Sequence, residues 1–326
     1  MKMKILLYYT PFFGYEKEMQ AVLEAAGHTV EYYNPRAFRS AFGRAFYKFI
    51  PWAVTGFTNR YHKKILKNLT YDYDVMLTND RVPQFVTQIL KKRNPQIQCC
   101  LYLDDSVRNL KGIEHYLCEY DRKVTFDRTD AQKYGMEFLP LYFRKEYASE
   151  NCKSAEPLCY DISFVGTCHS DRYKIIKQIK KMCDENGKTY KFYCYLQSKF
   201  VYRFYKLTKP EYRDTKITDF EFDKISAAQS SEIFRKSRCI LDIQHPLQTG
   251  LTMRTMETVG AKKKLVTTNA DIVNYDFYDS RNIYVADRQN PCFDISFLNG
   301  EYEETGFDTN KYSLKSWLEN LLKITL

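Results

Sequence analysis

Short apolar runs alternate with amphipathic segments along the first half of the chain. Strand-like runs are predicted at KILLYY (4–9), TVEYY (29–33), DVMLTN (74–79), IQCCLYLDD (97–105), KVTFD (123–127) and EFLPLYF (137–143). Helix-like spacing occurs at YEKEMQAVLEAAGH (15–28), which ends in Gly27 and His28, and at VPQFVTQILKKRN (82–94). Strands separated by single helices predict a parallel sheet with right-handed crossovers.

The same alternation starts again after a polar stretch at 144–157, which is the best candidate for a linker. Strand-like runs follow at 161–167, 191–196, 238–244, 265–268 and 282–288. Helix-like segments are predicted at 170–187, 226–237, 251–262 and 313–324, and a tyrosine-rich insertion lies between the second strand and the second helix. The pattern predicts an α/β protein with two Rossmann-like, doubly wound domains, at 1–150 and 151–310, facing a cleft.

Length and composition fit this picture and exclude several classes of protein. The chain has 326 residues, enough for two domains of ordinary size, and 44% of them are hydrophobic. Its ten cysteines form no C-x-x-C pair, which argues against a disulfide framework or a zinc site. Pro11 interrupts the first apolar run, so we interpret it as a strand and not a signal peptide. No run of 18 apolar residues occurs, and we expect a soluble, cytoplasmic protein.

The net charge of +10 is concentrated in one segment. No acidic residue lies between Glu31 and Asp72, and the same interval contains Arg36, Arg39, Arg44, Lys48, Arg60, Lys63, Lys64 and Lys67. On a helix, Phe38, Phe42, Ala45, Phe49 and Ala53 would share one side, and Pro51 would kink or end that helix.

This basic aromatic segment, 36–67, has two interpretations. It suits an anionic membrane surface, which would place the protein on the inner face of the cell membrane. Alternatively, its aromatic side packs on the N-terminal sheet and its cations are simply solvated. We favour the membrane, because forty residues without a carboxylate are unusual for a neutral surface. Nucleic acid would use the same charges, but no nucleic-acid motif accompanies them, and we expect no nucleic-acid partner.

The segment HPLQTGLTMRTMETVG, 245–260, follows the strand ILDI (240–243) and opens a helix after Gly250. Unpaired amides and the dipole at a helix start attract phosphate. Arg254 and Glu257 would then contact a phosphate and a ribose, or they would merely pair on the surface. A second glycine turn, Gly166-Thr167, follows the strand DISFV. Neither turn is a G-x-G-x-x-G or a G-x-x-x-x-G-K-S/T motif, which argues against a dehydrogenase and a nucleoside triphosphatase.

Three quoted stretches resemble the donor-binding half of glycosyltransferases with the GT-B fold: YDISFVGTCHSDRYKII, CILDIQHPLQTGLTMRTMETVGAKKKLVTTNADIVNYDFY and NIYVADR. LYLDDSVRN and VTFDRTDAQKYGMEFLPLYF are similar to the first half of the same group. The likeness is to enzymes of bacterial capsule and lipopolysaccharide biosynthesis, related to the spore-maturation glycosyltransferase-like (CgeB-like) family. The resemblance covers most of the chain.

The resemblance implies that the C-terminal domain binds a nucleotide-sugar donor and the N-terminal domain an acceptor, with a helix at 311–326 packing back on the N-terminal domain. Glu257 matches the glutamate that holds the donor ribose. The other implied donor-binding residues are Gly166, Thr167, Arg172, His245, Gly250, Leu251, Thr252 and Arg254, of which Gly250, Leu251 and Thr252 match the helix start that receives the diphosphate. Many retaining members carry a second glutamate eight residues before the first, where this chain has Thr249. The sequence therefore does not indicate inversion or retention.

Two acidic motifs have a functional and a structural interpretation. Asp72 and Asp74 form a D-x-D, the metal signature of another glycosyltransferase fold, but they directly precede an apolar run and better fit the start of a strand. Asp104 and Asp105 follow a strand, and one of them would deprotonate an acceptor hydroxyl or cap a loop. His115 and His169 are isolated and weak candidates.

The sequence thus predicts a metal-independent GT-B glycosyltransferase without a cofactor. It would move a sugar from a nucleotide to a lipid-linked or polysaccharide acceptor in bacterial cell-surface glycan synthesis. Three alternatives remain at this stage: a non-catalytic module that binds nucleotide sugars or phosphate, a membrane- or nucleic-acid-associated scaffold, and a metal-dependent transferase.

Overall fold

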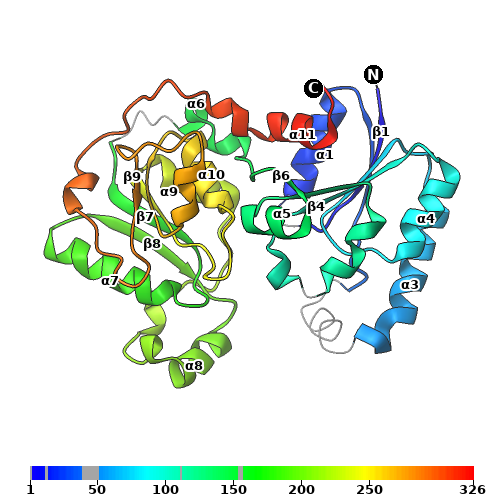
Figure 1. The fold of residues 1–326 in the computed structure, drawn as a ribbon. Coiled ribbons are helices and arrows are strands. Elements are labelled where there is room, and N and C mark those ends of the chain that lie inside the picture. Colours follow the sequence, from blue (N-terminus) through cyan, green and yellow to red (C-terminus); the bar gives the residue numbers. More distant parts are fainter. Residues whose placement is uncertain (1, 12–13, 39–50, 111, 153–156) are drawn as a thin grey trace. The chain divides into compact units, whose positions relative to one another are not determined.

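The computed structural model describes residues 2–11, 14–38, 51–110, 112–152 and 157–326 (Figure 1). Its contacts divide the chain into two compact units. The first unit comprises Met1–Leu139 and Leu318–Leu326, and the second comprises Pro140–Trp317.

A six-stranded parallel sheet forms the centre of the first unit. Its strands are β1 (Lys4–Tyr8), β2 (Thr29–Tyr33), β3 (Val75–Thr78), β4 (Gln98–Leu103), β5 (Arg122–Thr125) and β6 (Glu137–Phe138), in the order β2-β1-β3-β4-β5-β6. The helices are α1 (Tyr15–Ala25), α3 (Pro51–Asn68), α4 (Gln84–Arg93) and α5 (Arg128–Tyr134). All four side chains of β3 are buried, as expected for a parallel strand covered on both faces.

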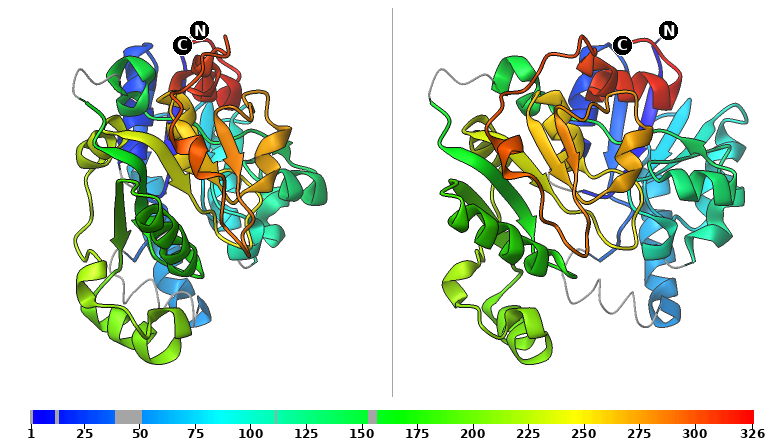
Figure 2. Two further views of the ribbon diagram at one scale, coloured as in Figure 1. Left: turned by 90° about the vertical axis from the view of Figure 1, so that its left-hand side faces the viewer. Right: turned by 60° about the vertical axis from the view of Figure 1, so that its left-hand side comes forward.

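The second unit is built around a five-stranded parallel sheet. Its strands are β7 (Tyr160–Thr167), β8 (Tyr190–Tyr195), β9 (Ser237–Asp242), β10 (Lys264–Thr267) and β11 (Ile283–Val285), in the order β11-β10-β9-β7-β8. Its helices are α6 (Ser149–Cys152), α7 (Arg172–Glu185), α8 (Lys199–Thr208), α9 (Ala227–Arg235) and α10 (Met253–Gly260), and α11 (Leu314–Leu322) begins in it. Figure 2 shows this sheet with α7 beside it and α8 beyond α7.

Both sheets reverse their strand order at one point. In the first unit the chain moves from β1 to β2 on one side and then continues with β3 on the other. In the second unit it moves from β7 to β8 and then continues with β9. Connections leave such a position in opposite directions, and the carboxyl ends of the strands open a crevice in which doubly wound proteins bind ligands. The predicted α/β class with two Rossmann-like domains is confirmed, and the predicted cleft between them stays a prediction.

Two predicted elements differ from the structure. The strand predicted at 137–143 joins the sheet only at Glu137 and Phe138, because Pro140 has no amide hydrogen to continue the ladder, and Phe143 forms an isolated parallel bridge with Ser313. The tyrosine-rich insertion contains helix α8, whose amino end is capped by the Ser198 hydroxyl accepting from the Val201 amide.

The contacts separate the units between Leu139 and Pro140, whereas the sequence analysis separated the domains at 150. The predicted linker 144–157 contains ordered structure of the second unit. Tyr147 packs against Phe234 of α9 with ring centroids 4.9 Å apart, and the buried Cys152 belongs to the same cluster. A polar composition alone did not reveal these buried anchors.

The last nine residues, Leu318–Leu326, belong to the first unit. The Arg122 guanidinium on β5 donates hydrogen bonds to the carbonyl oxygens of Asn320, at 3.2 Å, and Leu321. Leu318 and Leu321 are buried. Ion pairing with Glu137 holds the pKa of Arg122 above its usual value, so the donor stays charged.

Most of the predicted basic aromatic helix, including Phe42, Ala45 and Phe49, lies outside the described residues. In the part that the structure describes, Pro51 begins α3, and Phe57 on that helix is exposed. Among the described residues, no helix combines the length and the apolar character needed to cross a bilayer.

Candidate functional site

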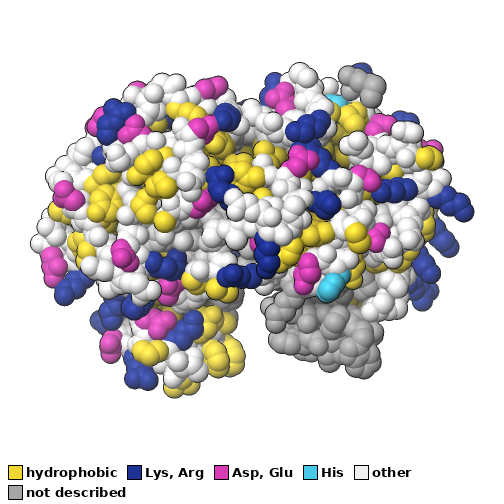
Figure 3. All heavy atoms as spheres, viewed as in Figure 1, with side chains coloured by type: hydrophobic (Ala, Val, Ile, Leu, Met, Phe, Trp, Pro, Cys, Tyr) yellow, Lys and Arg dark blue, Asp and Glu magenta, His cyan; other side chains and the backbone are white. Residues whose placement is uncertain are grey.

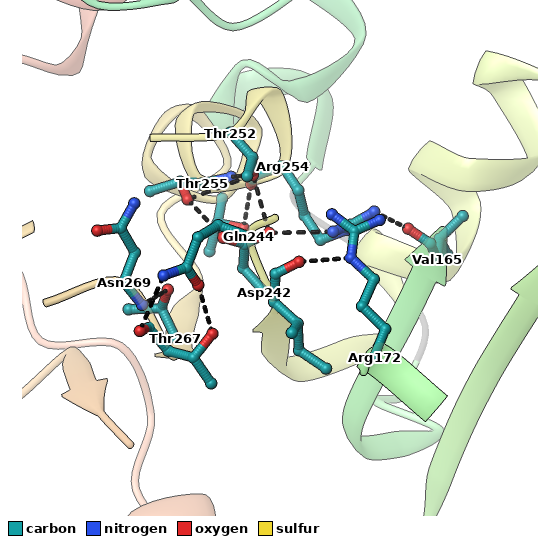
Figure 4. Close-up of polar contacts among 12 residues, drawn as sticks. Val165, Arg172, Asp242, Gln244, Thr252, Arg254, Thr255, Thr267 and Asn269 are labelled. Atoms are coloured by element: carbon teal, nitrogen blue, oxygen red, sulfur yellow. Dashed lines mark hydrogen bonds and ion pairs between the residues drawn. The ribbon is translucent and has the colours of Figure 1, made fainter. Parts of the chain in front are cut away.

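The carboxylate of Asp242 organises the crevice of the second unit (Figure 4). Asp242 is the last residue of β9 and is fully buried. Its Oδ1 accepts hydrogen bonds from Thr252 Oγ1 at 2.8 Å and Arg254 Nη1 at 3.0 Å, and its Oδ2 accepts one from Thr255 Oγ1 at 3.0 Å. A buried carboxylate with a cation and two hydroxyls is well compensated, and it fixes the first turn of α10 to the end of β9.

Helix α10 begins at Met253, two residues later than predicted, because Thr252 acts as its N-cap. The Thr252 hydroxyl accepts from the Thr255 amide at 3.2 Å while donating to Asp242. The preceding loop is held by Asn269, whose Nδ2 donates to the carbonyl oxygens of Thr249 at 2.9 Å and Gly250 at 3.2 Å. Leu251 is fully buried and anchors the same loop. These contacts therefore hold the backbone amides at the start of α10 in fixed positions.

Arg254 connects the neighbouring strands β9 and β7 of this sheet. Besides pairing with Asp242, its guanidinium donates to the carbonyl oxygen of Val165 on β7 and lies 4.7 Å from the ring centroid of Phe164. Glu257, one turn further along α10, is buried. Arg254 and Glu257 are therefore not a solvent-exposed surface pair, which was one interpretation of their spacing.

Gly166 is needed to accommodate Arg254. A Cβ atom at this position would lie 2.5 Å from Arg254 Nη2 and 3.1 Å from the Phe164 ring. Gly166 does not have a positive φ angle, so space, and not backbone conformation, explains the glycine here.

We expect Gly166→Ala to destabilise the second unit by about 1–3 kcal/mol, because the added methyl displaces the guanidinium of Arg254 or the ring of Phe164. Thermal unfolding measures this effect. Gly56→Ala is the matched control, since a Cβ at this helical position would meet nothing within 4 Å. Equal unfolding temperatures for Gly166→Ala and the wild type would contradict the packing role.

Arg172 is the second arginine at the crevice. It is the first residue of α7, and its Nε donates to the carbonyl oxygen of Ile243 at 2.6 Å while Nη1 donates to that of Thr167 at 3.0 Å. Burial and, to a smaller extent, the nearby charge of Arg254 lower its pKa to about 10. Arg172 thus stays charged at neutral pH. Among the described residues, carbonyl oxygens are its only hydrogen-bond partners.

Further positive charge surrounds His169, in the turn between β7 and α7. Burial and the charges of Arg172, His245 and Lys209 together lower the pKa of His169 to about 3. The His169 and His245 rings lie 5.4 Å apart. His169 is therefore neutral at physiological pH, and the crevice is an environment that disfavours additional positive charge and favours an anion.

Arg288 and Asp171 form an ion pair that the sequence analysis missed. Arg288 Nη2 and Nε lie 2.7 Å and 2.9 Å from the two carboxylate oxygens of Asp171, and Nη2 also donates to the carbonyl oxygen of Gln244 at 3.1 Å. Arg288 comes shortly after β11, in the quoted stretch NIYVADR. The signal available in the sequence was an arginine at the end of the predicted strand 282–288.

The first unit has its own polar cluster at the carboxyl ends of β1, β3 and β4. Asp104 follows β4, and its Oδ2 accepts from Asn79 Nδ2 at 2.8 Å and from the Tyr9 hydroxyl at 3.4 Å. Burial, opposed in part by the hydrogen bond from Asn79 and supported by the carboxylates of Asp105 and Asp80, raises the pKa of Asp104 to about 6. Tyr9 and Asn79 follow β1 and β3, which flank the point of reversal. A carboxyl group with such a pKa is suited to proton transfer near neutral pH.

Asp105 has different contacts from its neighbour. Its Oδ1 accepts from the Ser106 amide at 2.9 Å and from Asn109 Nδ2 at 2.7 Å. These are the loop-capping contacts given above as the alternative to catalysis. Asp104 is therefore the better candidate for a general base.

Asp80 and Arg36 add an ion pair to the same edge, with Arg36 Nε 2.5 Å from Asp80 Oδ2. The Thr10 hydroxyl also donates to this carboxylate oxygen, at 3.3 Å. Arg36 was predicted as part of the basic segment, but no pattern in the sequence indicated its partner.

The D-x-D motif lies elsewhere, at the amino end of β3. Asp74 Oδ2 accepts from the Lys4 amide at 2.7 Å, which holds β1 beside the start of β3. This contact agrees with the interpretation of Asp74 as the start of a strand. Among the described residues, no group of three or more His, Cys, Asp or Glu side chains is placed to hold a metal ion.

Several solved structures similar to this chain are glycosyltransferases. A trehalose-6-phosphate synthase, studied with bisubstrate glycomimetics, has a TM-score of 0.64 at 15% identity, with 99% of this chain and 98% of that chain covered. A glycosyltransferase from Rickettsia africae has a TM-score of 0.62 at 14% identity, covering 99% and 97%. An alpha-glucosyltransferase solved with UDP and DNA has a TM-score of 0.55 at 15% identity, covering 99% and 90%. No family profile and no curated protein matches the chain.

The fold is GT-B. The resemblance noted in the sequence is thereby confirmed at the level of the fold, whereas the capsule and lipopolysaccharide group is not. Within the GT-B fold, the second unit brings together Gly166, Thr167, Arg172, His245, Gly250, Leu251, Thr252 and Arg254 around the ends of β7 and β9. Asp104 and Asp105 lie in the first unit.

Proposed function

We propose that the chain is a glycosyltransferase whose second unit binds a nucleotide-sugar donor at the carboxyl ends of β7 and β9. The observation that carries this proposal is Arg172, a buried cation whose partners among the described residues are carbonyl oxygens. The nearby Asp242 carboxylate acts on Arg172 but already pairs with Arg254, so one anion serves two largely buried cations, and an anionic ligand lowers the cost of burying them. A diphosphate supplies this charge, and the neighbouring start of α10 supplies amides that bind phosphate.

The reaction would be a displacement at the anomeric carbon of the donor sugar. An acceptor oxygen forms the new bond to this carbon, while the bond to the diphosphate oxygen breaks. Positive charge at Arg172 and Arg254 stabilises the departing diphosphate, and the fixed helix start adds a preorganised dipole. Asp104 would accept the proton of the acceptor hydroxyl, and Glu257 would hold the donor ribose.

The finer parts of the proposal rest on the sequence. The resemblance favours a lipid-linked or polysaccharide acceptor in bacterial capsule or lipopolysaccharide synthesis, and the basic segment 36–67 favours work at the inner face of the cell membrane. We also propose that transfer needs no metal, because arginines and a helix dipole can serve in its place. Activity that persists in EDTA would support this last point, and loss of activity in EDTA would contradict it.

A panel of nucleotides and nucleotide sugars tests the donor site. Thermal unfolding is measured with each nucleoside, nucleoside diphosphate and nucleotide sugar, because a ligand raises the unfolding temperature in proportion to its affinity and concentration. We expect a diphosphate and its sugar to stabilise the protein and the matching nucleoside to have no effect. The proposal fails if no diphosphate-containing compound binds.

The pH dependence of the reaction tests the role of Asp104. A general base acts in its deprotonated form, so kcat/KM should fall as the pH drops through about 6, the raised pKa of Asp104. Asp104→Asn should lower kcat by about 100-fold or more and remove this dependence. A wild-type profile that is flat between pH 5 and 7 would exclude Asp104 as the base.

A stability measurement provides an independent control. The pKa of Asp104 is higher in the folded chain than the value of about 3.9 in an unfolded one. Its contribution to stability is therefore fully present below about pH 4 and is lost as the pH rises through about 6. Asp104→Asn should be more stable than the wild type at pH 7.5 but not at pH 4.

A further inference from the structure

Helix α8 has two apolar faces, and its own unit covers only one of them. Tyr202 is buried in the core of the second unit, and Val201 and Tyr205 pack against the same core. Phe200, Phe204 and Leu207 are 78%, 54% and 82% exposed. Their spacing of four and three residues places them on one face of the helix, roughly opposite the buried face.

This exposed face, which we call the α8 apolar stripe (Phe200, Phe204 and Leu207), lies at an end of the unit. Figures 1 and 2 show α8 beyond α7, away from the sheet. In Figure 3, hydrophobic side chains gather at the same end, with Lys and Arg side chains nearby. Large apolar side chains that share an exposed face mark a site of interaction more often than isolated ones do.

The segment that carries the stripe has charge of a single sign. Residues 186–210 contain no Asp or Glu and six cations, which are Lys188, Lys191, Lys199, Arg203, Lys206 and Lys209. Lys199 and Arg203 are exposed, and on a helix they lie along one edge of the stripe. This arrangement is complementary to a partner that has an apolar interior and anionic groups where it meets water.

Helix α8 is also held firmly on its unit before any partner arrives. The Tyr202 hydroxyl and Lys206 Nζ both donate to the carbonyl oxygen of Thr215, at 2.9 Å and 2.7 Å, and Ser198 caps the helix. A preformed helix does not lose folding entropy on binding, so its exposed side chains act at once as an anchor.

We propose that the α8 apolar stripe and its flanking cations bind the surface of an anionic lipid bilayer. Ten residues are too few to span a membrane, but they suffice to lie in the interface with Phe and Leu side chains below the head groups. Lys199 and Arg203 then contact anionic head groups. An acidic protein would match the cations as well, but three large side chains exposed without a polar or acidic residue among them favour the lipid. This surface belongs to the second unit and is separate from segment 36–67, and it does not depend on the proposed donor site.

Cosedimentation of the full chain with vesicles tests the proposal. The vesicles contain phosphatidylcholine either alone or with 30% phosphatidylglycerol, as a probe composition of roughly physiological anionic content. We expect binding to the mixed vesicles, weaker binding in 1 M salt, where the screening length falls to about 3 Å, and little binding to phosphatidylcholine alone. The variant Phe200→Ser/Phe204→Ser/Leu207→Ser should lose binding by about tenfold or more, because its apolar contact with the bilayer is removed.

A control variant makes the test specific. Val273→Ser changes an exposed apolar residue of the same unit. It should bind like the wild type, and both variants should unfold at the wild-type temperature, because the changed side chains are exposed. Failure of the wild type to bind anionic vesicles would overturn the proposal. Wild-type binding by the triple variant would also overturn it.

Discussion

Replacing Glu257 with alanine is expected to weaken nucleotide-sugar binding by about 100-fold or more. A carboxylate that accepts hydrogen bonds from both hydroxyls of a ribose contributes about 1.5–3 kcal/mol for each bond to a charged group. Glu257 is buried on α10, the helix whose start we propose as the phosphate site. Isothermal titration of the wild type and the variant with the best ligand of the nucleotide panel measures the change.

Two comparisons separate this effect from a loss of structure. Glu232→Ala removes an exposed carboxylate from α9 of the same unit and should leave the affinity unchanged. Burial and the charge of Glu257 both raise the pKa of Tyr147, so Glu257 is also part of a buried environment, and the unfolding temperature of each variant must be measured alongside. Unchanged affinity of Glu257→Ala for every nucleotide sugar that the wild type binds would refute the assignment.

Replacing Arg254 with alanine should cost about 3 kcal/mol of folding stability and should abolish measurable donor binding. The variant leaves the Asp242 carboxylate buried without its cation, and breaking a buried ion pair on one side costs about 3–5 kcal/mol. The hydroxyls of Thr252 and Thr255 still donate to Asp242, which places the expected value at the lower end. Denaturant unfolding, followed by hydrogen exchange of the β9 and α10 amides, measures the loss in the unit concerned.

A second variant separates stability from binding. Arg254→Ala/Asp242→Asn removes the unpaired charge, so part of the lost stability should return while donor binding stays absent. Arg281→Ala, which breaks the exposed pair with Asp279, should change neither property. Recovery of donor binding in the double variant would show that Arg254 acts only through Asp242 and not on the diphosphate.

The alternation of apolar runs predicted nearly every strand of both sheets, because parallel strands covered on both faces read as short, continuous hydrophobic segments. The runs at 74–79 and 161–167 correspond to β3 and β7 with shifts of only one or two residues at their ends. Periodicity alone did not predict the order of the strands in each sheet. That order depends on which side of the first strand each following strand is added.

The site was predicted in part. Gly166 was singled out as a glycine that precedes a helix. A side chain is excluded there because the guanidinium of Arg254 occupies the space, and Arg254 lies on α10, almost ninety residues later in the chain. Asp242 was overlooked because it ends an apolar run, where a charged residue looks like the first residue of a loop. The signal in the sequence was a carboxylate ten residues before Thr252, at the end of a buried strand. Contacts between residues that are far apart in the sequence depend on the fold, so local sequence patterns do not predict them.

The crossing of the chain between the units has a consequence for any attempt to separate them. The chain passes from the first unit to the second after Leu139 and returns after Trp317, so the second unit is inserted into the first. A single break near Leu139 would leave the second unit still joined to the last nine residues, which dock on β5 through Arg122. A gene fragment that ends at Leu139 lacks this closing segment and exposes the apolar surface that Leu318 and Leu321 cover. The first unit is therefore formed by two separate stretches of the chain. To produce this unit alone, Leu139 must be joined to Leu318 by an artificial linker.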